Sequence, residues 1–103
     1  MRSSDYRRIY AEGLRVAGPY FTAVCHKMEQ PQGPRIGFTV PRTLGKAVVR
    51  NRLKRRLREG VRLQLHRLAP QWEIVLQPRR AALTAGFEDL QRELERLFTR
   101  CAG

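Results

Sequence analysis

The residues of this sequence best suited to chemistry are the Lys and Arg side chains between Gly45 and Arg62, in the run GKAVVRNRLKRRLREGVR. Glu59 is the only acid within that run. Guanidinium and ammonium groups bind phosphates through charge-assisted hydrogen bonds. With so few acids to form i,i+4 pairs, like charges repel along a helix and lower its stability. The alternative is a charge run that only solvates a helix face. The missing acids favour a surface that binds an anion.

A helical projection gives the basic segment two faces. The apolar stripe can pack on a sheet or a second helix, and it consists of Val49, Leu53, Leu57, Gly60, Val61 and Leu68. The opposite face presents polar side chains, flanked by Arg52 and Lys54, and these are Asn51, Arg55, Arg58 and Arg62. We therefore predict a helix that holds its cations in a fixed pattern and that Pro70 ends.

The charge of the whole chain indicates what that anion is. The 103 residues carry a formal net charge of +12, with a pI near 11.3, which predicts a polyanionic partner. Anionic membrane is the rival, but a membrane-surface helix would carry Trp, Phe or Leu on its apolar face and Lys along its flanks. The basic helix combines Val, Leu and Gly with an Arg-dominated polar face. Nucleic acid is the expected partner, and no membrane is.

Cys25 and Cys101 lie far apart and outside any CxxC or Cys/His ligand spacing. We expect two buried free thiols in a reducing compartment and no zinc site. The sequence has no run of about eighteen apolar residues and no apolar signal-peptide core. These features predict a cytoplasmic protein.

The other titratable residues do not form a catalytic set in the sequence. A metal-dependent nuclease needs clustered carboxylates, and no DxD-like pair lies in the basic region. His26 and His66 have no neighbouring general acid or base. We predict no catalytic residue and no metal ligand. Aromatic side chains are candidates for stacking on bases, with core packing as the alternative for each, and they are Tyr6, Tyr10, Tyr20, Phe21 and Phe38.

The elements that must position these residues can be read from periodicity. A short helix begins at Ser3 or Ser4 and ends near Gly13, and a final helix follows Thr84. Strands are predicted over residues 20–28, 36–40 and 72–77, with the first two paired as an antiparallel hairpin. The order α-β-β-α-β-α predicts an α+β sandwich of one small sheet and its helices.

The run AVVRNRLKRRLRE resembles the arginine-asparagine-arginine signature of the bacterial ribonuclease P protein subunit. The segments SSDYRRIYAEG, YFTAV, RIGFTV and WEIVLQPR resemble other parts of that family, in its order and spacing. The resemblance covers residues 1–103 as a single domain. It implies a two-layer α+β sandwich of order α-β-β-β-α-β-α with a left-handed βαβ crossover, a fold also found in domain 2 of ribosomal protein S5. A fourth strand is therefore expected between Gly13 and Arg42.

The resemblance also implies a function. The family's protein is the non-catalytic subunit of an endoribonuclease, whose catalytic RNA holds the Mg²⁺ ions and removes the 5′ leader of precursor tRNA. The protein binds the single-stranded leader and stabilises the complex of RNA, metal and substrate, with no protein partner required. A ribosomal or other structural RNA-binding protein is the alternative, since composition and helix pattern support it equally.

The matching positions imply the site. Residues expected to face RNA are Arg42, Lys46, Arg50, Asn51, Arg52, Lys54, Arg55, Arg58 and, on the same helix face, Arg62. Tyr10 and Phe21 match aromatic positions of the leader cleft, and Val24 stands where some members have an aromatic residue. Pro41, Arg42 and Thr43 replace a common serine, lysine, lysine, so one cation is missing there. Lys46 stands where a neutral residue is frequent and can replace that charge.

Overall fold

The structure is a computed structural model that describes residues 3–30 and 33–102. Short 3-10 turns precede and follow the basic helix and precede the last helix, and these are η1 (Arg42–Leu44), η2 (Leu65–Arg67) and η3 (Arg80–Leu83). The helices and strands are α1 (Ser3–Glu12), β1 (Leu14–Ala17), β2 (Phe21–Lys27), β3 (Arg35–Phe38), α2 (Ala47–Gln64), β4 (Trp72–Pro78) and α3 (Phe87–Ala102). The implied order α-β-β-β-α-β-α is confirmed, and β1 is the expected fourth strand.

The four strands form one mixed sheet in the order β1-β2-β4-β3. β2 pairs antiparallel with β1 and with β4, and β3 pairs parallel with β4. The predicted hairpin between residues 20–28 and 36–40 is therefore wrong, because β4 lies between these strands. β4 suits the centre of the sheet because Ile74, Val75 and Leu76 are all fully buried, so both of its faces are apolar.

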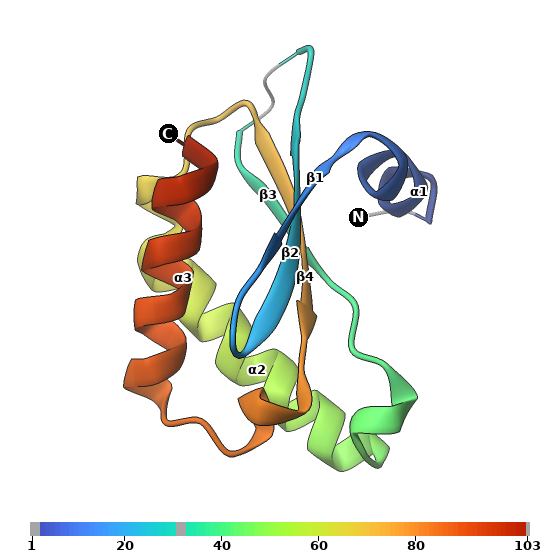
Figure 1. Cartoon of the computed structure of the whole chain (residues 1–103), viewed down its shortest axis with the longest axis vertical. Helices are drawn as coiled ribbons and strands as arrows, with labels where there is room; N and C mark the ends of the chain where they lie inside the picture. Colours follow the sequence, from blue (N-terminus) through green and yellow to red (C-terminus); the bar gives the residue numbers. More distant parts are fainter. Residues whose placement is uncertain (1–2, 31–32, 103) are drawn as a thin grey trace.

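Helices lie on both faces of the sheet (Figure 1). α2 and α3 cover one face, where alternate residues of β2, namely Phe21, Ala23 and Cys25, join the main core. α1 lies on the other face, over a smaller core of Ile9, Val24 and Val75. In this sandwich, α1 therefore packs apart from α2 and α3, on the opposite face of the sheet. Among the described residues, α1 is the only α-helix on this second face (Figure 1).

The apolar stripe of α2 packs as predicted, except at its first residue. Leu53, Leu57, Gly60 and Val61 are buried, as is Leu68 beyond the helix. Val49 is 37% exposed, so its place in the stripe is wrong. It lies in the first turn of α2, where it packs over Gly45 instead of the sheet.

Cys25 is not the free thiol that the sequence predicts. It is buried and disulfide-bonded. The side chain of Cys101 lies outside the described part of the chain. Cys25 therefore contributes to the main core as half of a disulfide.

Candidate nucleic-acid interface

The turn before α2 fixes where the basic helix begins. The Leu44 amide donates to the Pro41 carbonyl at 3.1 Å, and the Gly45 amide donates to the Arg42 carbonyl at 3.2 Å. Gly45 has a φ of +146°, which favours glycine, and a Cβ there would lie 3.2 Å from a Val49 methyl. Lys46 then caps α2 without a side-chain hydrogen bond, and the first turn holds no acid. The positive end of the helix dipole therefore adds to the field of the cations.

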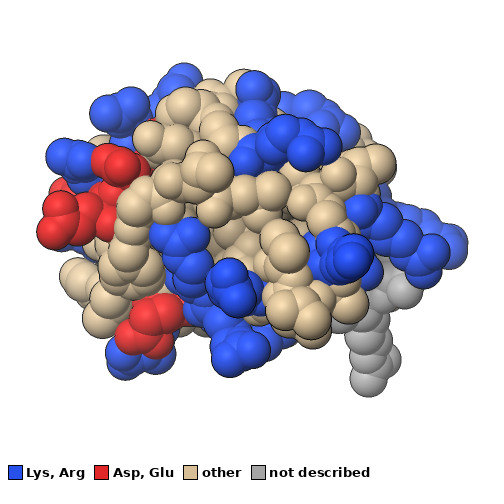
Figure 2. Space-filling view, turned by 90° about the horizontal axis from the view of Figure 1, so that it is seen from below, with Lys and Arg blue, Asp and Glu red and all other residues tan. Residues whose placement is uncertain are grey.

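The structure brings the predicted RNA-binding side chains together along α2 and the turn before it. Arg50 and Lys54 are half-buried, and the remaining seven are exposed: Arg42, Lys46, Asn51, Arg52, Arg55, Arg58 and Arg62. Arg62 is the only cation of this set that forms an ion pair with a residue in the described ranges. Figure 2 shows Lys and Arg over much of the end of the molecule where α2 begins, with acids only toward the side of α3.

Three cations of α2 differ from the rest. Arg62 donates to the carboxylate of Glu59 at 2.6 and 3.1 Å. This hydrogen bond lowers the pKa of the Glu59 carboxyl and raises the pKa of Arg62, so the pair holds opposite charges. Arg50 instead has a buried Nε that finds no acceptor within the described residues. Arg56, outside the predicted set, donates to the Ala85 carbonyl at 2.6 Å and ties α2 to the segment before α3.

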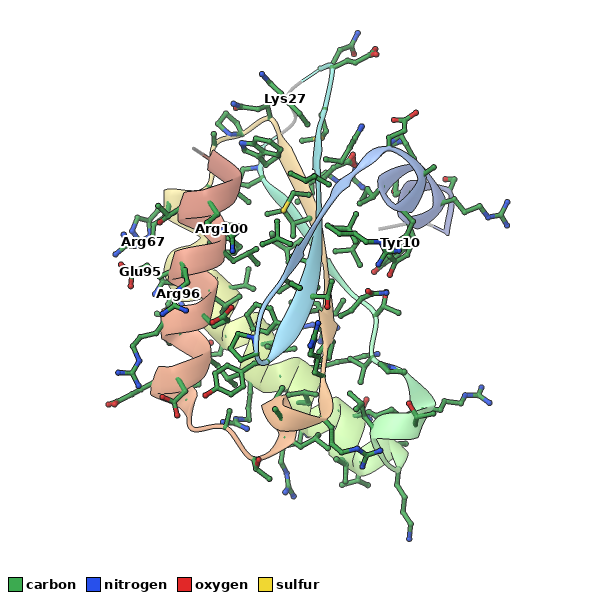
Figure 3. All side chains as sticks on the ribbon, in the orientation of Figure 1. Tyr10, Lys27, Arg67, Glu95, Arg96 and Arg100 are labelled. Atoms are coloured by element: carbon green, nitrogen blue, oxygen red, sulfur yellow. The ribbon has the colours of Figure 1, made fainter. Side chains whose placement is uncertain are left out.

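A second polar surface lies on the other face of the sheet, beside α1. Tyr10 points from α1 toward the sheet (Figure 3). Its hydroxyl donates to Thr39 Oγ1 at 3.0 Å and accepts from Gln77 Nε2 at 2.9 Å. The Arg15 guanidinium lies 5.9 Å from the centre of its ring. Thr22, which pairs with Gln77 across β2 and β4, extends this surface.

The structure does not bring the three predicted leader-cleft residues together. Phe21 is 1% exposed and faces α2 and α3, on the opposite side of the sheet from Tyr10. Successive side chains alternate between the faces of a strand, which separates Phe21 from Thr22. Val24 is on the Tyr10 face but is fully buried beneath α1. Only Tyr10 of the three is partly exposed, so a leader-stacking role for Phe21 and Val24 does not fit this structure.

Sequence reasoning missed other polar residues beside Tyr10. Arg79 Nη2 donates to Thr22 Oγ1 at 3.3 Å, and its amide donates to the Tyr20 carbonyl at 2.7 Å. The PRR run after the last predicted strand was the signal for Arg79. No sequence pattern indicated Arg15, because its strand β1 has only four residues and too little alternation to be recognised.

A group of acids, Asp5, Glu12 and Glu73, lies where α1 contacts the sheet. The fully buried carboxylate of Glu73 accepts from Arg8 at 2.6 and 2.8 Å, and this hydrogen bond raises the pKa of Arg8. His26 Nδ1 lies 3.3 Å from Glu73 Oε2, and His26 Nε2 lies 3.0 Å from Glu12 Oε2. These contacts join α1 to β2 and β4 at one wall of a polar cavity of about 650 Å³. The cluster has a clear structural role in holding α1 against the sheet.

Comparison with known proteins connects this geometry to a family, because a family model described as Ribonuclease P matches residues 1–102. The chain belongs to the ribonuclease P protein family. A curated relative from Symbiobacterium thermophilum, named "Ribonuclease P protein component", is 46% identical over 97 residues, covering 92% of this chain and 83% of the relative. One of the same name from Acidothermus cellulolyticus is 40% identical over 100 residues, covering 96% and 83%.

Solved structures of ribonuclease P proteins share the fold. The protein from Thermotoga maritima has a TM-score of 0.89 and 30% identity, with 100% of this chain and 97% of that chain covered. The protein from Staphylococcus aureus has a TM-score of 0.85 and 27% identity, with 97% and 91% covered. The resemblance seen in the sequence and its implied fold class are thus confirmed. Family membership connects the chain to ribonuclease P and to tRNA processing.

The described residues of this ribonuclease P protein do not suit a metal site. No group of three or more His, Cys, Asp or Glu side chains in residues 3–30 and 33–102 is placed to hold an ion. The acids instead pair with arginines, as Glu73 does with Arg8.

No helix in residues 3–30 and 33–102 has both the length and the apolar character to cross a membrane.

Proposed function

We propose that this chain is the RNA-binding subunit of ribonuclease P, acting with a catalytic RNA to remove the 5′ leader of precursor tRNA in the cytoplasm. The observation that carries the proposal is the row of cations on α2 and η1, of which only Arg62 has an acidic partner among the described residues. Such a row repels itself unless an anion neutralises it. In a ribonuclease P protein, the anion that fits is the phosphate backbone of RNA.

The division of labour follows from which groups the protein has. Its cations bind phosphates, whereas the described part of the chain offers no site for the Mg²⁺ that phosphodiester hydrolysis uses. The RNA subunit supplies the metal sites in this scheme. The protein supplies binding energy and stabilises the complex of RNA, metal and substrate, with no further protein required.

The surface beside Tyr10 is the proposed path of the single-stranded leader. Single strands bind where aromatic rings are combined with a positive groove. Tyr10 offers the ring, and Arg15 and Arg79 offer the charge. Because the Tyr10 hydroxyl is held by Thr39 and Gln77, the ring is already oriented before RNA binds. A base stacked on it would contribute about 1–3 kcal/mol.

One experiment separates this function from its rivals. Precursor tRNA and Mg²⁺ are incubated at moderate salt with the protein alone, with a bacterial ribonuclease P RNA alone, and with both. We expect cleavage at the mature 5′ end that requires the RNA and is enhanced by the protein. The cleavage site is mapped by primer extension, and the rate is measured as single-turnover kcat/KM.

The other outcomes identify the alternatives. Cleavage by the protein without RNA would indicate a self-sufficient nuclease. RNA binding without enhancement of cleavage would favour a ribosomal or other structural RNA-binding protein, and the proposed function would be wrong.

A further inference from the structure

An apolar groove lies between the edge strand β3 and α2, on the α2 side of the sheet. It has a volume of about 260 Å³, and most of its surface is apolar. Two arginines of α2 reach it at the solvent side. The lining residues are Pro34, Ile36, Phe38, Val61 and Leu65, together with Arg58 and Arg62.

The groove is an extension of the main core that stays open to solvent. Ile36, Phe38 and Leu65 pack against that core but remain partly exposed, while Val61 between them is 7% exposed. Leaving such apolar surface in water is unfavourable unless a partner covers it. The proposed leader surface does not use it, because Tyr10 lies on the other face of the sheet.

The charges at the rim indicate the partner. Arg58 is exposed and forms no ion pair with the residues that the structure describes. Arg62 is held by Glu59, so its guanidinium is fixed beside the groove. An apolar slot with a cation at its rim matches a nucleotide, which has a flat base and an anionic phosphate.

We propose that this groove binds one unstacked nucleobase of an RNA strand, with Arg58 on the adjacent phosphate. The inference rests on the proposed RNA-binding function and adds a second base site to it. Phe38 provides the aromatic contact, and Ile36 and Leu65 provide aliphatic walls. Because most of its surface is apolar, the groove discriminates little between bases.

A protein partner fits the groove less well. Adding a strand to the β3 edge requires a row of free backbone groups. β3 has only four residues, and Pro34 directly before it has no amide hydrogen. A second copy of this chain would be repelled, because each copy carries a net charge of +12. An acidic peptide is the remaining rival.

The test follows the methyl signals of Ile36, Val61 and Leu65 by NMR while the full chain is titrated with three probes. The probes are an eight-nucleotide adenylate RNA, an abasic ribose-phosphate octamer of equal charge, and a poly-glutamate peptide. We expect the adenylate octamer to move all three sets of methyl signals. The abasic octamer should bind at the basic face yet leave them unmoved, and so should the peptide.

Two matched variants test the energetic contribution. Leu65→Gln places an amide in the groove and should weaken binding of the adenylate octamer about three- to tenfold. Leu63→Gln makes the same change on an exposed residue of α2 outside the groove, and should change affinity less than twofold. The NMR titration of the unaltered chain remains decisive if Leu65→Gln fails to fold.

The results distinguish a failure of the base site from a failure of the proposed RNA-binding function. Octamer binding that leaves the three methyl groups unmoved would overturn the base site while the proposed function stands. Methyl shifts caused equally by the abasic octamer or by the peptide would also overturn it. An absence of any binding by the octamer would contradict both the base site and RNA binding itself.

Discussion

Tyr10 has two roles that can be separated because different atoms carry them. Its hydroxyl bridges Thr39 and Gln77, which connects α1 to β4 and to the segment after β3. Its ring faces the Arg15 guanidinium and is the stacking surface in the proposed leader path. The hydroxyl therefore serves stability, and the ring serves binding in the proposed leader path.

Replacing Tyr10 with Phe or with Ala tests that separation. Tyr10→Phe leaves two hydrogen-bonding groups without a partner and should lower the free energy of unfolding by about 1 kcal/mol. Its affinity for leader RNA should change less than twofold. Tyr10→Ala should weaken leader binding by about 1–3 kcal/mol. Urea unfolding and fluorescence anisotropy with a labelled leader measure the two effects. Equal leader affinity for the two variants would remove the ring from the site.

At the scale of elements, α2 presents opposite chemistry to its two sides. Leu53 and Leu57 fix its apolar side on the sheet and α3, so the cations stay exposed although only Arg62 has an acidic partner among the described residues. Because Arg55 and Arg58 are exposed, their removal should affect RNA binding and not folding.

Arg55→Ala combined with Arg58→Ala tests the RNA-binding side of α2. Removing two phosphate contacts should make the slope of log K against log salt shallower by about 1.4, at about 0.7 per contact with a single strand. The control is Arg96→Ala on the outer side of α3, distant from Tyr10 (Figure 3). Anisotropy titrations at several salt concentrations give the slopes. An unchanged slope in the double variant would show that RNA binds elsewhere.

The junction of α1 and β1 depends on a close approach at Gly13. A Cβ there would lie 2.5 Å from the Ile9 carbonyl oxygen and 2.6 Å from a Val24 methyl. The Gly13 amide also donates to that same carbonyl at 2.7 Å. The backbone therefore turns from helix to strand in a space that admits no side chain.

Gly13→Ala should lower the free energy of unfolding by about 3 kcal/mol, because backbone atoms cannot move aside without losing the turn. Gly86→Ala is the control, since among the described residues a Cβ at that position would come within 4 Å of Asp89 Oδ2 alone, at 3.5 Å. Its effect should stay within about 0.5 kcal/mol. Urea unfolding measures both variants, and a Gly13→Ala protein as stable as the parent would contradict the packing of this junction.

At the scale of the whole molecule, charge is distributed unevenly. Acids gather around Glu73 beneath α1 and along α3, whereas among the cations proposed to bind RNA on α2 and η1 only Arg62 has an acidic partner within the described residues. The net charge of +12 is therefore concentrated where RNA is proposed to bind.

This distribution predicts a steep dependence of RNA binding on salt. The seven predicted RNA-binding cations that form no ion pair within residues 3–30 and 33–102 give a slope near −5 for single-stranded RNA, at about 0.7 counterions each. Isothermal titration at increasing potassium chloride concentrations measures the slope. A value shallower than about −2 would mean that few of these side chains contact phosphate.

The elements were largely predictable because their periodicity is local. The α2 stripe was visible in the sequence from Leu53 to Leu68, and the basic face followed from the same projection. The pairing of strands was not, because it depends on contacts between residues about fifty positions apart, as in Phe21 with Pro78. β1 was inferred only from the family resemblance.

The candidate site was predictable on α2 and less so at the sheet. An exposed helix face follows directly from residue spacing, so the cations lie where they were expected. Phe21 could not be assigned to a face from its aromatic character alone, since either face of β2 can hold a core. The groove beside β3 depends on how far α2 stands from the sheet edge, which no local pattern encodes.

The central place of β4 has a consequence for the time at which the fold can form. During synthesis, β1 and β2 emerge together and can pair at once, because their register partners lie within eleven residues of each other. β3 and α2 emerge next, but the strand to which β3 pairs has not yet been made. Only when residues 72–78 leave the ribosome can β2 and β3 be joined, and closing contacts over such separations is slow. Until then, the nascent chain carries its cations before it has a completed sheet to hold them.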